Sequence, residues 1–224
     1  MHGTVHLVRH GAVHNPNGVF YGRLPGYRLS ARGQREAQAV AEKLSTRPIY
    51  AVWASPLERA QETAAAIAER HGVPVVTDER LTERASAYEG RPRGLRAVLA
   101  LAFGEVRLAS LLRSVGNEPI RDVSQRMVDV IRDALLASDG REIVMVSHRT
   151  PLLVARYAFT RGQTPRWWGL SRCATGSLTT LVMMGQKAQA VSYSVPRRMR
   201  LRWPHESRWS HRSAGAGMDN TGRI

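Results

Sequence analysis

The sequence predicts an α/β protein of three layers (α/β/α), in which helices cover both faces of a mostly parallel central sheet. Short apolar segments rich in β-branched residues alternate with segments of helical periodicity along most of the 224 residues. Residues that start and stop helices separate the two kinds of segment. This alternation is typical of parallel strands joined by helices.

The first half of the chain contains three predicted strands and two predicted helices. A Gly- and Pro-rich loop over residues 12–27 follows the first strand, and Ser30 is placed to cap the first helix, Ala31–Leu44. The predicted strands are Thr4–Val8, Tyr50–Trp53 and Val73–Val76.

The second helix has the clearest start signal in the chain. Ser55 is a suitable N-cap, Pro56 suits the first helical position, and Glu58 stands three residues after Ser55, as in a capping box. We expect this helix to run to Arg70, because Gly72 favours a helix end.

The second half begins with weak periodicity and then becomes regular. Glycines interrupt the apolar stretches of residues 85–116, which predicts an irregular or partly helical insertion over the sheet. The elements predicted after it are a helix over Ile120–Ala137, a break at Asp139-Gly140, a strand over Glu142–Ser147, a helix opened by Thr150-Pro151, and a strand pair over Ser177–Met184 and Lys187–Ser194.

The length suits one domain, which we place at residues 1–196, followed by a basic, poorly ordered tail at 197–224. The net charge is +15, with 26 basic and 16 acidic residues in the domain and seven and two in the tail. The excess is therefore spread along the chain, and no nucleic-acid-binding motif accompanies it. We do not expect nucleic acid to be the partner.

The apolar segments are short and cysteine is rare. No run of 18 apolar residues occurs, and a strand that begins by Thr4 leaves no room for a secretory signal, so we expect a cytoplasmic protein without a membrane partner. Cys173 is the only cysteine and cannot form an internal disulfide.

Two histidines occupy equivalent positions, His10 after the first strand and His148 after the strand Glu142–Ser147. Ligands of open α/β sheets bind beyond the carboxyl ends of the strands, so both imidazoles should face one crevice. Arg9 and Arg59 should supply guanidinium groups there, which suit phosphoryl oxygens. A metal site with His10, His148 and an acid is the rival interpretation, but two arginines beside a divalent cation would be unfavourable.

Four ordered motifs resemble the histidine phosphatase superfamily, also called phosphoglycerate mutase-like, and this resemblance covers about residues 4–195. It implies the phosphoglycerate mutase-like fold and a phosphatase or mutase that uses neither metal nor cofactor. A segment over residues 13–26 also resembles an actinobacterial subgroup. The four motifs are Arg9-His10-Gly11, Ser55-Pro56-Leu57-Glu58-Arg59-Ala60-Gln61-Glu62-Thr63-Ala64, Leu81-Thr82-Glu83 and Val146-Ser147-His148.

The resemblance implies a role for each matching residue. His10 would attack phosphorus and form a phosphohistidine, and Glu83 would act as general acid and base. Asn15 would add an amide donor to the phosphate pocket. The residues that would hold the phosphoryl oxygens are Arg9, Arg59 and His148.

The pattern leaves several points open. Glu79 and Glu89 lie near Glu83 and are alternatives for the acid. Ala12 stands where many relatives carry an acidic residue. Arg149 stands where many have glycine, so its side chain would either block the pocket or bind an extra anionic group of the substrate.

Hydrolysis is favoured over isomerisation, because residues 83–90 look more like the phosphatase branch than the mutase branch. A cluster of arginines in or beside the insertion predicts either a substrate with several anionic groups or an ordinary solvated face: Arg84, Arg91, Arg93 and Arg96. A non-catalytic phosphate-binding protein is the third class. The expected partner is a small phosphorylated substrate, and a homodimer is compatible with the sequence.

Overall fold

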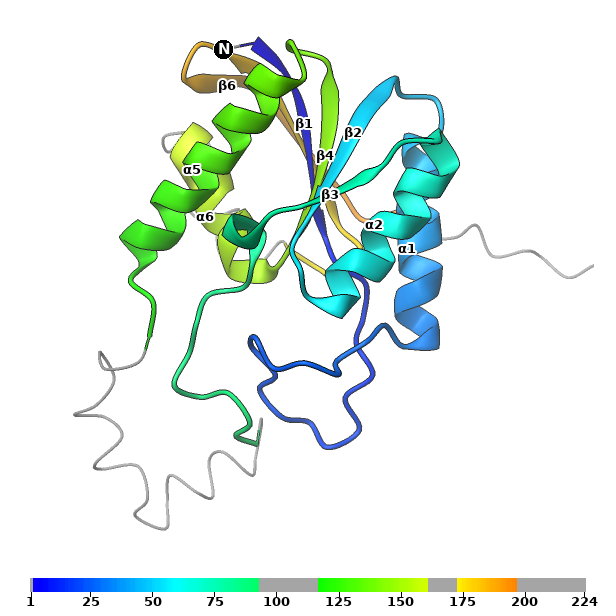
Figure 1. Ribbon diagram of the computed structural model, residues 1–224, viewed down its shortest axis with the longest axis vertical. Helices are drawn as coiled ribbons and strands as arrows, with labels where there is room; N and C mark the ends of the chain where they lie inside the picture. The colour runs from blue at the N-terminus through cyan, green and yellow to red at the C-terminus, as the bar shows by residue number, and fades with distance from the viewer. Residues whose placement is uncertain (1, 93–116, 161–172, 197–224) are drawn as a thin grey trace, which may run out of the picture.

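The computed structural model describes residues 2–92, 117–160 and 173–196. Within them lies one six-stranded sheet of order β3-β2-β4-β1-β5-β6 (Figure 1). The strands are β1 (His2–Arg9), β2 (Ile49–Ala54), β3 (Val75–Thr77), β4 (Glu142–Ser147), β5 (Leu178–Met184) and β6 (Lys187–Ser194). In this sheet β5 alone points opposite to the other strands, so the strands are mostly parallel in direction, as predicted.

Helices cover both faces of the sheet, which confirms the predicted α/β/α class (Figure 1). Neighbouring residues of β1 show the division. Leu7 packs into the core cluster that α5 (Ile120–Ala137) and α6 (Arg149–Thr160) share with the sheet. Val8 packs into the cluster on the other face, with α1 (Ala31–Leu44) and α2 (Glu58–His71). Alternate side chains of a strand point to opposite faces, so both layers are anchored on the same strand.

Helix α5 matches its predicted bounds, and its buried face is the predicted one. Four side chains at a spacing of four residues are at most 2% exposed, namely Val123, Met127, Ile131 and Leu135. Truncation of such a side chain to alanine costs about 2–5 kcal/mol. The predicted break follows, with Asp139 at φ 50° and Gly140 at φ 72°.

The predicted start of α2 is wrong. The helix begins at Glu58, Leu57 occupies the N-cap position, and no side chain caps the first turn. Ser55 follows the end of β2 directly, and its hydroxyl bonds to His148 instead of capping the helix. The predicted end is confirmed, because Gly72 closes α2 in the left-handed conformation at φ 63°.

Other predicted elements are confirmed to within a few residues, and Ser30 caps α1 by accepting a hydrogen bond from the Gly33 amide. Residues 93–116 of the predicted insertion and the predicted tail at 197–224 lie outside the described residues. Among the described helices, none combines the length and the apolarity needed to cross a lipid bilayer.

The sheet order brings three strand ends together. In the parallel register Arg9 of β1 lies beside Ser147 of β4, and Ala54 of β2 lies beside Val146. The residues that follow these strands, His10, Ser55 and His148, therefore leave the sheet at the same edge.

Candidate active site

The two predicted histidines lie side by side at this edge. Their ring centroids are 5.0 Å apart and the ring planes are tilted by 56°. His10 is 1% exposed and His148 is fully buried. The topology thus brings together residues that are 138 positions apart in the chain.

One hydrogen bond fixes the tautomer of His10. Its Nδ1 lies 2.8 Å from the carbonyl oxygen of Gly11. A carbonyl oxygen can only accept, so Nδ1 must carry the hydrogen. In the neutral ring the free lone pair is then on Nε2, which is the form required of a nucleophile.

Both imidazoles are held neutral. Burial lowers the pKa of His10 well below its usual value, and the positive charges of Arg59 and Arg9 lower it further. Burial also lowers the pKa of His148 well below its usual value, and His10, Arg59 and Arg9 act in the same direction. Near pH 7 the site therefore combines uncharged imidazoles with cationic guanidinium groups.

The loop that carries His10 is packed tightly against α1. A Cβ atom on Gly11 would lie 2.3 Å from the carbonyl oxygen of Gly33, so only glycine fits there. The Gly11 amide donates to Thr63 Oγ1 at 3.1 Å, and that hydroxyl donates to the Arg59 carbonyl at 2.7 Å. Thr63 thus links the loop after β1 to the first turn of α2.

Arg59 is a fully buried cation. Its Nη2 donates to the Gly22 carbonyl at 2.6 Å, and its guanidinium lies 4.8 Å from the ring centroid of Tyr21. Burial lowers the pKa of Arg59, while charge interactions with Tyr21 and Glu83 oppose that shift. The charge of Glu83 therefore acts on this same site.

Four buried side-chain nitrogens of Arg9, Arg59 and His148 lack a hydrogen-bond partner in the part of the chain that the structure describes. They are Arg9 Nε, Arg59 Nε, Arg59 Nη1 and His148 Nδ1. Another nitrogen of the Arg9 guanidinium does have a partner, because Nη1 donates to the Cys173 carbonyl at 2.5 Å. An unsatisfied buried donor costs about 1–3 kcal/mol. Donors of this kind beside cationic charge are what a bound oxyanion would satisfy.

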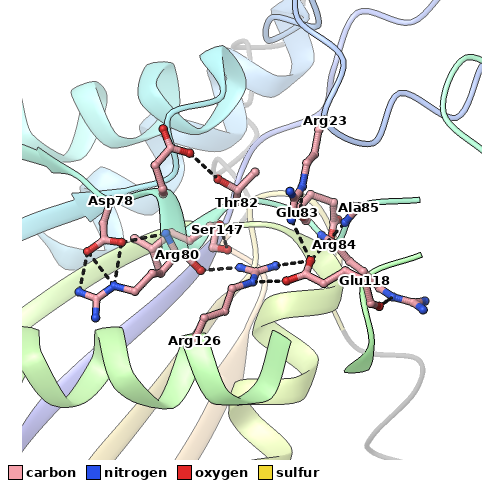
Figure 2. A network of polar contacts seen from close by, with 12 residues as sticks. Arg23, Asp78, Arg80, Thr82, Glu83, Arg84, Ala85, Glu118, Arg126 and Ser147 are labelled. Carbon is pink, nitrogen blue, oxygen red and sulfur yellow. Dashed lines mark hydrogen bonds and ion pairs between the residues drawn. The ribbon is translucent and has the colours of Figure 1, made fainter. Parts of the chain in front are cut away.

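Glu83 is half-buried and follows the short 3₁₀ helix η1 (Glu79–Leu81). Its Oε1 accepts from the Arg84 amide at 2.9 Å, and its carbonyl accepts from Arg23 Nε at 2.6 Å (Figure 2). Just upstream, Ser147 Oγ donates to the Leu81 carbonyl at 2.6 Å. The end of β4 and the loop of Arg23 thus hold the chain on either side of Glu83.

The alternative acids have other surroundings. Glu79 lies in η1, with one carboxylate oxygen 3.4 Å from the Thr82 hydroxyl. Glu89 packs against Gly22, where an added Cβ atom would lie 2.3 Å from its Oε1. The charge of Glu83 is among those that oppose the lowering of the Arg59 pKa by burial.

The remaining predicted residues lie as follows. Asn15 closes its own loop, donating from Nδ2 to the Val19 carbonyl at 2.8 Å and accepting from the Val19 amide at 3.1 Å. Asn15 Nδ2 carries a second hydrogen, and its donation to phosphate stays a prediction. Arg149 is exposed and begins α6 directly after His148. The amide of Ala12 donates to the Glu36 carboxylate at 2.8 Å, so an acidic group reaches this position from α1.

The sequence did not identify Ser55 as part of the site. Its Oγ lies 2.8 Å from His148 Nε2, and its side chain is fully buried. The available signal was its position, because Ser55 follows the end of β2 as the two histidines follow β1 and β4. The capping pattern obscured that signal.

Known proteins resemble this chain in sequence and in fold. The sequence profile of the histidine phosphatase superfamily (branch 1) matches residues 5–196. An uncharacterized Mycobacterium tuberculosis protein, Rv0525, is 44% identical over 199 residues, which cover 86% of this chain and 96% of that protein. This relative agrees with the predicted actinobacterial subgroup.

Relatives with assigned activities are more distant. A probable phosphoglycerate mutase of Enterobacter is 29% identical over 154 residues, covering 64% of this chain and 68% of that protein. The solved mycobacterial glucosyl-3-phosphoglycerate phosphatase superposes with a TM-score of 0.67 at 25% identity, covering 87% of this chain and 97% of that one. The fold, the strand-end histidines and the profile lead to one assignment: the chain belongs to the histidine phosphatase superfamily.

Proposed function

We propose that the protein is a phosphatase that hydrolyses small phosphomonoesters through a phosphohistidine on His10, without a metal ion. The observation that carries this proposal is the set of buried nitrogens on Arg9, Arg59 and His148 that have no partner among the described residues, beside a neutral His10. A phosphoryl group would satisfy those donors. Fixed cations also oppose a divalent metal at the same place.

In the first step Nε2 of His10 attacks phosphorus, so a P–N bond forms while the P–O ester bond breaks. The ester oxygen leaves as an alcohol after it takes the proton of Glu83. Arg9, Arg59 and His148 stabilise the charge on the equatorial oxygens, which is the main demand of a phosphoryl-transfer transition state.

In the second step the ionised Glu83 accepts a proton from water as the water oxygen attacks phosphorus. The P–N bond breaks, inorganic phosphate leaves, and the lone pair returns to Nε2 of His10. Glu83 is again protonated and ready for the next ester. The hydrogen on Nδ1 stays bonded to Nδ1 and is donated to the Gly11 carbonyl throughout.

The alternative function is a mutase, in which a second hydroxyl of the substrate takes the place of water. The similarity to a probable phosphoglycerate mutase favours this alternative, and the similarity to a solved phosphatase favours hydrolysis. Both reactions share the first step. A phosphate-binding protein without catalysis would have no use for the fixed nucleophilic tautomer of His10.

The test compares the wild type with His10→Ala on p-nitrophenyl phosphate, a panel of alkyl phosphates and phosphoglycerates, with and without a chelator. We expect phosphate release by the wild type, unchanged by the chelator, and loss of about 10³-fold or more in the variant. A matched control is His6→Gln, since His6 is 2% exposed but bonds to Thr180 and Glu142 away from the site.

Each other outcome has a defined meaning. Equal phosphate release by the wild type and His10→Ala would contradict the role of His10. Isomerisation that exceeds release would establish the mutase. If the wild type is inactive on the whole panel, the result would favour a phosphate-binding protein without catalysis.

A further inference from the structure

A charged cluster of Glu118, Arg23 and Arg126 lies beside the segment that carries Glu83 (Figure 2). The Glu118 carboxylate accepts from Arg126 Nε at 2.7 Å and Nη2 at 3.0 Å, and from Arg23 Nη2 at 2.8 Å. The side chains of Glu118 and Arg126 are 17% and 15% exposed, so solvent screens this pairing poorly. One largely buried carboxylate thus forms ion pairs with two cations.

The backbone of Glu118 is fastened to the same segment. Its amide donates to the Ala85 carbonyl at 3.1 Å, and its carbonyl accepts from Arg84 Nε at 2.7 Å. The Ala85 amide donates back to the Glu118 carboxylate at 3.3 Å. The two residues that follow Glu83 are therefore held by Glu118 through both main chain and side chain.

Arg23 connects this cluster to Glu83 directly. The same guanidinium donates from Nε to the Glu83 carbonyl at 2.6 Å and from Nη2 to Glu118. The preceding residue, Gly22, accepts the hydrogen bond of Arg59 through its carbonyl. Adjacent residues of one loop thus contact the proposed phosphate site and the proposed general acid.

Arg126 anchors the cluster to the scaffold. It belongs to α5, next to the fully buried Met127, and its Nη1 donates to the Arg80 carbonyl in η1. Burial opposes the ionisation of Glu118, but the bonds and charges of Arg126 and the other donors outweigh it and lower the pKa of Glu118. The carboxylate is therefore ionised across the working pH range and holds both arginines.

We propose that Glu118, through Arg23 and Arg126, is a positioning residue that fixes Glu83 for proton transfer to the leaving group. This inference rests on the proposed function and assigns it a residue that touches neither phosphate nor His10. Loss of the Glu118 charge leaves Arg23 and Arg126 without a carboxylate partner, so that the Glu83 segment is held less firmly. The phosphate site itself stays intact.

The dependence of the rate on the leaving group tests this role. A poor leaving group such as glycerol needs the proton of Glu83, whereas 2,4-dinitrophenolate leaves without it. We expect Glu118→Gln to lower kcat/KM for glycerol 2-phosphate about tenfold or more, and for 2,4-dinitrophenyl phosphate less than about threefold. We use kcat/KM because it reports transfer to His10, whichever later step limits kcat.

Three variants complete the experiment. Glu83→Gln should show the same selectivity with a larger effect, and Glu83→Gln/Glu118→Gln should be no slower than Glu83→Gln alone, because Glu118 acts through Glu83. Arg23→Met, at a side chain 38% exposed, gives a second probe that does not depend on the folding of the Glu118 variant. Arg23→Met should also lower kcat/KM more for glycerol 2-phosphate than for 2,4-dinitrophenyl phosphate, but by a smaller factor than Glu118→Gln.

Glu142→Gln is the matched control, because Glu142 is also 17% exposed and bonds to Arg47 and His6, at the start of β4. It should lower stability without leaving-group selectivity. Equal losses on both esters in Glu118→Gln and Arg23→Met, or no loss, would overturn the positioning role. If Glu83→Gln itself lacks selectivity while His10→Ala is inactive, the acid assignment fails and this inference with it, but the phosphohistidine mechanism survives.

Discussion

Ser55 Oγ lies 2.8 Å from Nε2 of His148, and both side chains are fully buried. The Leu57 amide donates to the same hydroxyl oxygen at 3.4 Å, and we infer that the hydroxyl donates its own hydrogen to Nε2. His148 then carries its hydrogen on Nδ1, the atom that has no partner among the described residues. Ser55 thus sets the tautomer in which His148 can donate to a phosphoryl oxygen.

Ser55→Ala should lower kcat/KM about tenfold or more and weaken inhibition by inorganic phosphate, because His148 would no longer be held in the donor tautomer. Steady-state kinetics with phosphate as a competitive inhibitor measure both effects. Ser138→Ala is the control, since Ser138 is 1% exposed and donates to the Leu135 carbonyl away from the site. Equal kinetics for Ser55→Ala and the wild type would contradict this role for Ser55.

Arg59→Met should abolish activity and yet raise Tm by roughly 2–4 °C. The substitution removes a fully buried cation, two of whose nitrogens have no partner within the described residues, and retains most of the side-chain volume. Calorimetry with and without inorganic phosphate measures the effect, and phosphate should raise Tm of the wild type only. A lower Tm for the variant would show that the buried guanidinium of Arg59 does not destabilise the fold.

The free energy of unfolding should fall as the pH falls from about 7 to 5. Burial is the main cause that lowers the pKa of His6, His10 and His148 below the usual 6.5, so the unfolded chain binds protons in this range that the folded chain does not. The depressed pKa values of Glu118 and Glu142 act in the same direction, but below their usual value of 4.5. Urea midpoints at pH 7.5 and 5.5 measure the direction of this change in stability. An equal or higher midpoint at pH 5.5 would contradict the prediction.

The acidic limb of the kcat/KM profile should lie below pH 6.5. His10 must be unprotonated to attack, and burial together with Arg59 and Arg9 holds its pKa well below that value. A pH series with p-nitrophenyl phosphate, paired with an NMR titration of the histidine rings, measures both quantities. If the acidic limb is centred above pH 6.5, so that activity is already lost there as the pH falls, His10 would lie in a more solvated setting than the structure describes.

Much of this fold and site could be predicted because local patterns and tertiary structure agree. Helix α5 has its apolar residues at helical spacing and a glycine at its end, so its predicted bounds match. His10 and His148 could be placed together because each follows an apolar strand. Ser55 shows where such reasoning fails: its local sequence favours a cap, but a buried imidazole from a distant strand binds its hydroxyl.

The cluster around Glu118 could not be predicted for a related reason. Its bonds to Arg23 and Arg126 span 95 and eight residues, and no local period relates them. The packing of α5 against η1 and the reach of Arg23 from the loop after β1 bring these charges together. Asn15 was expected at the phosphate, yet its side chain also stabilises its own loop through Val19, a local bond that the motif did not indicate.

The most direct test of the mechanism is the chemical form of the phosphorylated enzyme. The protein is mixed with a rapidly reacting aryl phosphate, quenched at alkaline pH, and examined by mass spectrometry and phosphorus NMR. Because Nδ1 of His10 is bound to the Gly11 carbonyl, we predict one phosphoryl group on Nε2 of His10 and none in His10→Ala. Phosphorylation on Nδ1, or a phosphorylated form that persists in His10→Ala, would contradict the mechanism.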